Sequence, residues 1–392
     1  MPNYLRYILF FFIALTIFSS IHYYIWRRLF KNTGLPDFWE KFSLYIIFTL
    51  LIYFIFAQFL SRMIPFNYSL PFLWLAYLWI GTMLLIFICL VFVDVIRFII
   101  FIFSKIFIPS NSEIDLERRQ LISQITASGV SIAVAAASGI SVFNYLSKPI
   151  VKKLNISLNG LPQIFDGFRI VQISDLHVGQ LMTKATLQEV VQQVNDLNPD
   201  LIAITGDLVD GSLDKLSNVI APIKDFSAQY GVFFVTGNHE YFNGAEKWIA
   251  EIKNLGITVL ENENVKIERN TDSFILAGVN DHEASRFGNK HAADLNKALS
   301  QSNNNNVVLL AHQPIAANAA AEYNVDLVLS GHTHGGQIWP INYLVYLQQP
   351  YIKGLYSYKN TQIYVNQGTG CWGPPMRLGT QNEITEITLM AV

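Results

Sequence analysis

Residues 331–337 read GHTHGGQ and directly follow the short apolar run of residues 327–330. A run of that length and composition, bounded by glycine, predicts a buried strand. The same junction of an apolar run with polar residues occurs at four earlier places: Asp175-Leu176-His177, Gly206-Asp207, Gly237-Asn238-His239-Glu240 and His312. In α/β sheets, ligands bind outside the carboxyl ends of the strands. The pattern therefore predicts one functional site that is assembled from five strand ends.

Short apolar runs alternate with amphipathic stretches throughout the carboxyl-terminal part of the chain, which predicts a layered α/β domain. The runs that we expect to form strands are residues 168–174, 201–205, 232–236, 274–277, 307–311, 327–330, 363–365 and 384–389. Helices fit between them. Thr183 is placed to cap one that runs to about Leu197, Asn243 to cap one that runs to Leu255, and a third covers residues 290–299.

The residue types at the five junctions favour a metal site. Burying an uncompensated polar group costs roughly 2–7 kcal/mol, so a cluster of buried Asp, Asn and His needs a shared partner. Of the eight histidines, five stand at the junctions: His177, His239, His312, His332 and His334. Carboxylate, amide oxygen and imidazole, without a thiolate, suit Mn²⁺, Fe or Zn²⁺.

The number of candidate ligands indicates two ions. One ion with an open position cannot use seven ligands, whereas two ions that share a carboxylate can; the candidates are Asp175, His177, Asp207, Asn238, His312, His332 and His334. Two cations about 3.5–4 Å apart hold a bridging hydroxide and neutralise the charge that develops on a phosphoryl group during in-line attack. Hydrolysis of a phosphate ester is the reaction that this indicates.

The junctions resemble the five ordered blocks of the calcineurin-like metallophosphoesterase superfamily, which are D-x-H, G-D, G-N-H-E/D, H and G-H-x-H. The resemblance extends from about Asn155 to the carboxyl terminus. GHTHGGQ is similar to the motif of the bacterial membrane-attached subgroup, which includes phosphodiesterases and lipid-sugar nucleotide pyrophosphatases. The resemblance implies an α/β fold in which a calcineurin-like layered β-sandwich is flanked by helices.

The same resemblance implies a role for each of the seven candidate ligands and for His239. Asp175, His177 and His334 would hold the first metal; Asn238, His312 and His332 would hold the second; and Asp207 would bridge them. His239 would protonate the leaving oxygen or stabilise the transition state, as suits an imidazole near neutral pH. The alternative for His239 is a hydrogen bond behind a metal ligand.

Three features near these motifs leave alternatives open. Arg377 either clamps a phosphate or is solvated on a loop. Asp281 and His282 either line the cleft or cap a loop. The aromatic residues around and after GHTHGGQ either form a lid that touches lipid or fill the core; they are Trp339, Tyr343, Tyr346, Tyr351 and Trp372.

The amino-terminal part of the chain is far more apolar than the rest. The whole chain is 52% hydrophobic and 14% charged, and its formal net charge of −2 leaves no basic footprint for nucleic acid. A spanning helix needs about 20 apolar residues. Residues 7–26, 42–60 and 71–93 meet this requirement, and residues 121–145 form a weaker fourth segment. We therefore expect a transmembrane helical domain over residues 1–148 and a metallophosphoesterase domain over residues 149–392.

The apolar stretch that follows the third span, up to residue 108, is too short to cross the bilayer again. Asp94 and Arg97 interrupt it three residues apart. The stretch is either an interfacial helix or the site of an intramembrane ion pair that lines a pathway.

The distribution of basic residues predicts the orientation, because cytoplasmic loops carry an excess of Lys and Arg. The first and third loops are the basic ones, with Arg27, Arg28, Lys31 and Lys41 in one and Arg97, Lys105, Arg118 and Arg119 in the other. Four spans then place the carboxyl-terminal domain outside the cytoplasmic (inner) membrane. With three spans the domain would face the cytoplasm.

The sequence thus predicts a metal-dependent phosphoric ester hydrolase that is anchored in the lipid bilayer by several spans. A hydroxide bridging two divalent ions would cleave a phosphoester or pyrophosphate bond of a lipid-linked or nucleotide substrate. The alternative is a metal-binding sensor or transporter accessory domain without turnover.

Overall fold

The computed structural model describes residues 3–107, 116–179, 181–300, 302 and 305–392. The chain divides into two compact units, unit 1 (Met1–Ile140) and unit 2 (Ser141–Val392). The division falls inside helix α4 (Leu116–Leu146), whereas the predicted domain boundary follows that helix. The boundary at residues 148 and 149 therefore stays a prediction.

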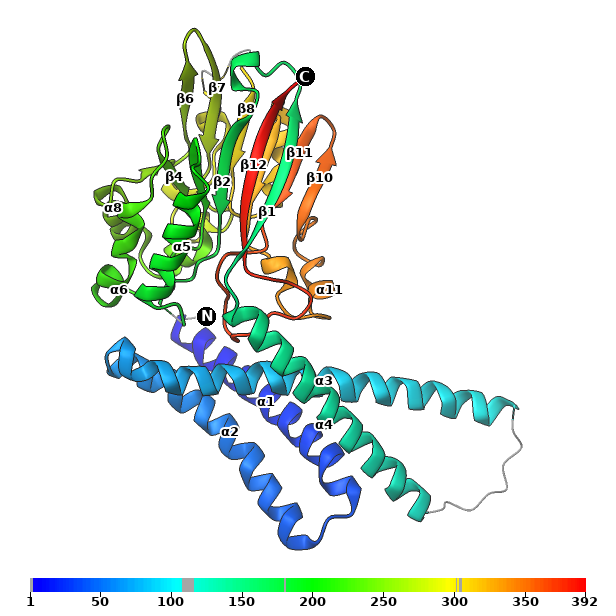
Figure 1. The fold of residues 1–392 in the computed structure, drawn as a ribbon. Coiled ribbons are helices and arrows are strands. Elements are labelled where there is room, and N and C mark those ends of the chain that lie inside the picture. Colours follow the sequence, from blue (N-terminus) through cyan, green and yellow to red (C-terminus); the bar gives the residue numbers. More distant parts are fainter. Residues whose placement is uncertain (1–2, 108–115, 180, 301, 303–304) are drawn as a thin grey trace. The chain divides into compact units, whose positions relative to one another are not determined.

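Unit 1 is built from long apolar helices (Figure 1), and α4 continues from it into unit 2. The other three are α1 (Asn3–Leu29), α2 (Asp37–Met63) and α3 (Phe66–Phe107). Among the residues that the structure describes, four segments are long and apolar enough to cross a membrane: Ile8–Thr33, Asp37–Ser61, Tyr68–Ile106 and Leu116–Leu146. The chain is accordingly a multi-pass membrane protein with four candidate spans, and the fourth predicted segment is among them.

The apolar stretch after the third span is not a separate interfacial helix. It continues α3, which runs for 42 residues, or about 63 Å at 1.5 Å per residue. Asp94 pairs with Arg28 of α1 and accepts a hydrogen bond from the Tyr24 hydroxyl at 2.6 Å. Arg97 instead donates to the Ile122 carbonyl of α4 at 3.2 Å. These polar residues therefore tie α3 to two other helices of unit 1.

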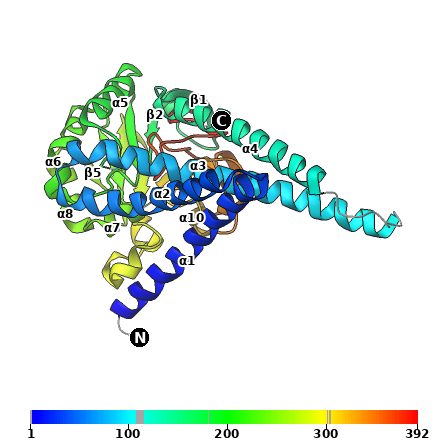
Figure 2. The same cartoon turned by 90° about the horizontal axis from the view of Figure 1, so that it is seen from below.

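Unit 2 contains two six-stranded mixed sheets that stack face to face, with helices on both outer faces (Figures 1 and 2). The first sheet has the order β1-β12-β2-β3-β4-β5, with β1 (Ile150–Leu158), β12 (Glu383–Ala391), β2 (Phe168–Ile173), β3 (Leu201–Thr205), β4 (Val232–Val235) and β5 (Thr258–Val259). The second has the order β10-β11-β9-β8-β7-β6, with β10 (Gly354–Tyr358), β11 (Thr361–Val365), β9 (Leu327–Ser330), β8 (Val307–Leu310), β7 (Asp272–Gly278) and β6 (Glu263–Arg269). The α-helices of this unit are α5 (Lys184–Asp196), α6 (Leu213–Ile220), α7 (Asn238–Phe242), α8 (Ala245–Asn254), α9 (Leu295–Ala298), α10 (Ala316–Ala320) and α11 (Asn342–Val345). The predicted α/β sandwich flanked by helices is confirmed.

Apolar side chains fill three layers of core. Between the sheets, Phe168, Phe274 and Tyr364 are fully buried. Outside the first sheet, α5, α6 and α8 bury residues such as Trp248, and outside the second sheet α10 buries Ala317. Both faces of the central strands are therefore covered, which explains why these strands read as continuous apolar runs rather than alternating ones.

The strand directions bring the predicted junctions together. Strands β2, β3 and β4 run parallel in the first sheet, and β8 and β9 run parallel in the second. Parallel strands of one sheet end at the same edge, so their following residues become neighbours. A side-chain hydrogen bond from Gln172 of β2 to the Ser330 carbonyl of β9, at 2.9 Å, joins the two sheets close to that edge.

The eight predicted strands are all present, with ends that agree to within two residues, and the predictions missed the edge strands β1, β5, β6 and β10. Strands β1, β6 and β10 carry mostly exposed or half-buried side chains and lack a continuous apolar run. The Thr183 hydroxyl caps α5, accepting from the Thr186 amide at 3.2 Å, as predicted. The prediction that Asn243 caps the next helix is wrong, because α8 begins at Ala245 after Gly244 with φ 94°.

The third predicted helix, over residues 290–299, is also mostly wrong. Only α9 (Leu295–Ala298) is α-helical, and a 3-10 turn covers Asn289–His291. The Asp294 side chain accepts the Lys297 amide at 3.0 Å and so starts α9 late. A local cap therefore outweighed the apolar periodicity.

Candidate metal centre

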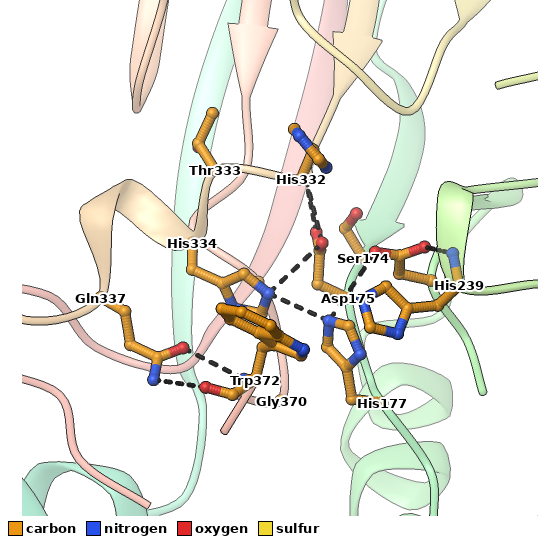
Figure 3. Close-up of polar contacts among 12 residues, drawn as sticks. Ser174, Asp175, His177, His239, His332, Thr333, His334, Gln337, Gly370 and Trp372 are labelled. Atoms are coloured by element: carbon orange, nitrogen blue, oxygen red, sulfur yellow. Dashed lines mark hydrogen bonds and ion pairs between the residues drawn. The ribbon is translucent and has the colours of Figure 1, made fainter. Parts of the chain in front are cut away.

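Asp175, His177 and His334 form one compact group (Figure 3). The first two follow β2 and the third follows β9, so the group joins both sheets. Nε2 of His177 lies 3.0 Å from Nε2 of His334, and Oδ1 of Asp175 lies 3.5 Å from the latter atom. The potential ligand atoms of the group all lie within 4.8 Å of one another.

Asp207, His312 and His332 form a second group of the same size. They follow β3, β8 and β9. Nε2 of His312 lies 3.1 Å from Oδ2 of Asp207 and 3.2 Å from Nδ1 of His332. The same Oδ2 atom lies 3.8 Å from Nε2 of His177 in the first group. One carboxylate oxygen therefore faces both groups.

Asn238 begins α7 directly after β4 and is buried. Its Oδ1 atom has no hydrogen-bond partner among the described residues. The next amide, that of His239, donates to Oδ1 of Asp207 at 2.8 Å. Asn238 therefore lies beside the second group with an unused oxygen, which is a costly arrangement without a partner.

His239 lies at the rim of this cluster. Its Nδ1 atom is 3.2 Å from Oδ1 of Asp210, and its ring centre is 4.6 Å from that of His177. Burial by itself would lower the pKa of His239, but the neighbouring carboxylates of Asp210 and Asp207 outweigh it and raise the pKa to about 9. The sequence interpretation missed Asp210, although its position three residues after Asp207 would have been the available signal.

The backbone at these positions is unusual for residues with a Cβ atom. Five of the site residues have a left-handed φ: Asp175 (53°), His177 (46°), Asp207 (47°), His332 (70°) and His334 (50°). L-residues rarely adopt this region, and such strain concentrates at functional sites where the surrounding fold imposes it. The sharp reversals turn consecutive side chains back over the end of the sandwich.

Two glycines permit the close approach of the strand ends. A Cβ atom on Gly331 would lie 1.9 Å from Oγ of Ser174, and one on Gly237 would lie 2.2 Å from Oδ1 of Asp207. Both distances are far below van der Waals contact. Any larger residue would therefore separate the loops that carry the candidate ligands.

Known proteins are similar in sequence to this chain over most of its length. Residues 168–336 match the calcineurin-like phosphoesterase family. A transmembrane protein with metallophosphoesterase domain from Danio rerio is 36% identical over 321 residues, which cover 78% of this chain and 73% of the relative. An uncharacterized metallophosphoesterase of Helicobacter pylori is 37% identical over 303 residues, covering 75% and 80%, and one of Campylobacter jejuni is 32% identical over 390 residues, covering 98% of both chains. The chain belongs to the calcineurin-like metallophosphoesterase family.

The donor atoms of this metallophosphoesterase fit divalent cations. Burial lowers the pKa of His177 to about 4, and burial together with His177 lowers the pKa of His334 well below its usual value. Two uncharged rings therefore face each other through nitrogen atoms only 3.0 Å apart. Burial also raises the pKa of Asp175, to about 6. Closely packed buried nitrogen and oxygen donors of this kind are what Mn²⁺, Fe or Zn²⁺ bind.

The second group is oriented by the backbone. Nδ1 of His312 lies 2.7 Å from the Thr205 carbonyl and can donate to it, so Nε2 is the atom that faces Asp207. Burial opposes charge on His312, but the Asp207 carboxylate outweighs it and holds the pKa of His312 well above its usual value. Burial and the charge of His312 lower the pKa of His332 to about 3. A second hydrogen bond that fixes the ring is typical of metal-binding histidines.

Glu240 is a further residue of the metallophosphoesterase site whose role the sequence did not predict. Its buried carboxylate accepts the amides of Gly237 (2.7 Å), Leu208 (2.9 Å), Asp207 (3.0 Å) and Val209 (3.1 Å). Burial and the charge of Asp207 raise the pKa of Glu240 to about 8. Glu240 thereby fastens the loop after β3 to the loop after β4. Its place at the end of the Gly-Asn-His-Glu block was the available signal.

Arg377 fits neither alternative that the sequence left open. Its guanidinium is fully buried, so it is not solvated, and it donates to backbone carbonyls, so it is not placed as a phosphate clamp. The acceptors are the carbonyls of Gln367 (2.8 Å), Gly368 (3.0 Å), His334 (3.3 Å) and Gly370. Burial lowers the pKa of Arg377 to about 10. Arg377 therefore stabilises the loop of residues 367–370 and joins it to the backbone of His334.

The structure also distinguishes between the alternatives that the sequence left open for Asp281, His282 and the aromatic residues. Asp281 accepts the Glu283 amide at 2.8 Å and the Gln313 side chain at 3.1 Å, so it organises a loop, while His282 is exposed. Most of the aromatic residues around GHTHGGQ do not fill the core. The exposed ones are Trp339, Tyr343, Tyr346 and Trp372.

Proposed function

We propose that this membrane-anchored metallophosphoesterase hydrolyses a phosphoester or pyrophosphate bond at the cluster of strand-end residues. The observation that carries the proposal is the pair of three-residue groups linked by one carboxylate oxygen, Oδ2 of Asp207, which lies 3.1 Å from His312 and 3.8 Å from His177. Two divalent cations bound there would polarise the phosphoryl oxygens and lower the pKa of a water molecule that attacks phosphorus.

The residues would divide between two metal positions. We assign Asp175, His177 and His334 to one position and Asn238, His312 and His332 to the other, with Asp207 shared. Manganese, iron or zinc would suit these ligands. The unpartnered Asn238 oxygen and the facing His177 and His334 nitrogens support the assignment.

We assign His239 the transfer of a proton to the leaving oxygen. Its ring lies next to the first group, 4.6 Å from the His177 ring centre, and Oδ1 of Asp210 lies 3.2 Å from its Nδ1 atom. The opposite ring nitrogen is then left to face a substrate. General acids of this kind typically contribute about 10²- to 10⁴-fold to turnover.

The rim of the site favours a substrate with an apolar part. Trp372 and Phe242 are both about half exposed, and their ring centres lie 6.2 Å and 5.3 Å from that of His239. Stacked or apolar groups of a lipid-linked or nucleotide phosphate would contact these rings. The membrane anchor makes a lipid-linked substrate the first to test.

We further propose that the protein resides in the cytoplasmic (inner) membrane of a bacterium, with unit 2 on the outer side. The four candidate spans and the basic first and third loops support this orientation. A protease-protection assay on membrane vesicles of known orientation tests it. Cleavage of unit 2 only from the cytoplasmic side would overturn it.

The hydrolase proposal is tested with the full-length protein purified in detergent and loaded with Mn²⁺. We expect it to release p-nitrophenol from bis-p-nitrophenyl phosphate, and we expect EDTA to abolish the release. Asp207→Asn is the inactive variant, and Asp272→Asn, exposed at the start of β7, is the matched control. Metal binding without turnover for Mn²⁺, Fe²⁺ and Zn²⁺, with monoester, diester and pyrophosphate probes alike, would favour a metal-binding sensor instead.

A further inference from the structure

Unit 2 exposes an unusual density of large apolar side chains in residues 339–347, which include α11. The exposed ones are Trp339 (56%), Tyr343 (63%), Leu344 (63%), Tyr346 (52%) and Leu347 (81%). Single exposed apolar residues are ordinary on soluble surfaces, but a cluster marks a surface that something covers. The 339–347 segment therefore needs a partner.

The segment is held in place at both ends, so its exposure is built into the fold. At its start, the Trp339 amide donates to the Leu378 carbonyl at 2.8 Å. Just beyond its end, the buried Gln349 side chain accepts the Ile315 amide at 3.0 Å and donates to Gln313 at 3.0 Å. Because the loop is anchored at both ends, its apolar side chains stay exposed on the surface of unit 2.

The loop residues next to Leu378, which hold Trp339 in place, also contact the end of α4. The Arg377 amide donates to the Ser141 carbonyl at 2.9 Å, and the Asn144 side chain donates to the Arg377 carbonyl at 3.0 Å. Arg377 immediately precedes Leu378, the residue that pairs with Trp339. In Figure 1, α11 and the last turn of α4 lie at the same end of unit 2.

That last turn belongs to a candidate span. The span Leu116–Leu146 is apolar to its end, where Phe143 and Leu146 are 70% and 65% exposed. The end of a spanning helix lies at the boundary between lipid and water. The 339–347 segment is therefore held within one short loop of that boundary.

The charge of this region matches a phospholipid surface. No acidic residue occurs between Asp326 and Glu383, whereas Lys353 is exposed. Tyrosine and tryptophan are enriched where proteins meet the headgroup region, and exposed lysines are attracted to anionic lipids. Tyr343, Tyr346 and Trp339 fit that environment better than they fit water.

We propose that the 339–347 segment inserts its apolar side chains into the headgroup region of the bilayer in which the chain is anchored. Gly336, beside His334, packs so closely on Asn342 that an added Cβ would lie 2.2 Å from it. The metal centre would thus open next to the lipid surface. The proposal does not rest on the proposed hydrolysis, because it concerns a surface rather than a reaction.

The test uses nitroxide labels on the full-length protein in nanodiscs of phosphatidylethanolamine and phosphatidylglycerol. Leu344→Cys and Leu347→Cys carry the label in a Cys89→Ser background, and the same background without an added cysteine corrects for labelling of the buried Cys371. Thr271→Cys, on the exposed turn between β6 and β7, is the aqueous control. Ile132→Cys, exposed on the apolar α4, is the lipid control.

We expect oxygen to relax labels at positions 344 and 347 more than a water-soluble nickel chelate does, by a ratio several-fold above that at Thr271 and approaching that at Ile132. A ratio equal to that at Thr271 would overturn the proposal. Protection from both reagents would also overturn it, because a protein surface, either another helix of the chain or a second copy, would then cover the segment. Each variant is first required to match the thermal unfolding of the background protein.

Discussion

Replacing Glu240 with alanine tests whether one buried carboxylate assembles the metal centre. The side chain is fully buried and accepts four backbone amides at 2.7–3.1 Å, three of them from the loop that carries Asp207. Glu240→Ala would leave those four donors buried without an acceptor. The loops after β3 and β4 would then lose the hydrogen bonds that join them through Glu240.

The expected loss of stability follows from the number of donors. Each buried donor that loses its acceptor costs about 1–3 kcal/mol, so four cost at least about 4 kcal/mol. For a unit of this size, each kcal/mol corresponds to about 2–4 °C in Tm. We therefore expect the thermal unfolding of unit 2 to shift down by about 8 °C or more.

The assay is thermal unfolding of the full-length protein in detergent, with and without Mn²⁺. Glu246→Ala is the matched control, because that side chain is 68% exposed and pairs with Lys290 on the surface. Exposed pairs of this kind contribute about 0–1 kcal/mol. Glu240→Gln keeps the shape but offers an NH₂ group to some of the amides, so an intermediate shift is expected. A Tm shift for Glu240→Ala no larger than that of Glu246→Ala would refute the reasoning.

Three further substitutions test the site. Asp207→Asn is expected to weaken metal binding by more than about 100-fold, because loss of residues that merely support ligands already costs about 10- to 100-fold; near-unchanged affinity in calorimetric titration would remove the shared-ligand assignment. His239→Ala is expected to retain its metal content, measured by elemental analysis, and to lower turnover by about 10²-fold or more; unchanged turnover would end its catalytic role. Arg377→Met is expected to lower the free energy of unfolding by at least about 3 kcal/mol, since four buried carbonyls lose their donor. A normal Tm with a raised KM for phosphate esters would instead restore the phosphate-clamp interpretation.

The candidate metal ligands could be predicted from the sequence because they all occupy the same kind of position along the chain. Each candidate ligand follows an apolar run, and strands of one sheet that run in parallel end at one edge. Asp175 and Asp207 of one sheet, and His312 and His332 of the other, could therefore each be grouped before any distance was known. The structure brings the two sets together with His177 and His334.

Residues that act through nonlocal partners were less accessible. Asp210 and Glu240 are ordinary acidic residues in the sequence, and only the fold shows that one contacts His239 and the other collects four amides. Arg377 was misjudged for the same reason. A Gly-Pro-rich loop suggests a solvated arginine, yet the loop folds inward over His334.

The sequence by itself determined the elements whose side-chain pattern is local: the apolar spans, the buried strands, the Thr183 cap and the order of the candidate metal-binding motifs. Only the tertiary structure decided that α3 continues unbroken, that polar edge strands such as β1 complete the sheets, and that the 339–347 segment stays exposed. The physical reason is that the residue type determines what a side chain can bind. Burial and partnership, by contrast, depend on which distant segment the fold places against it.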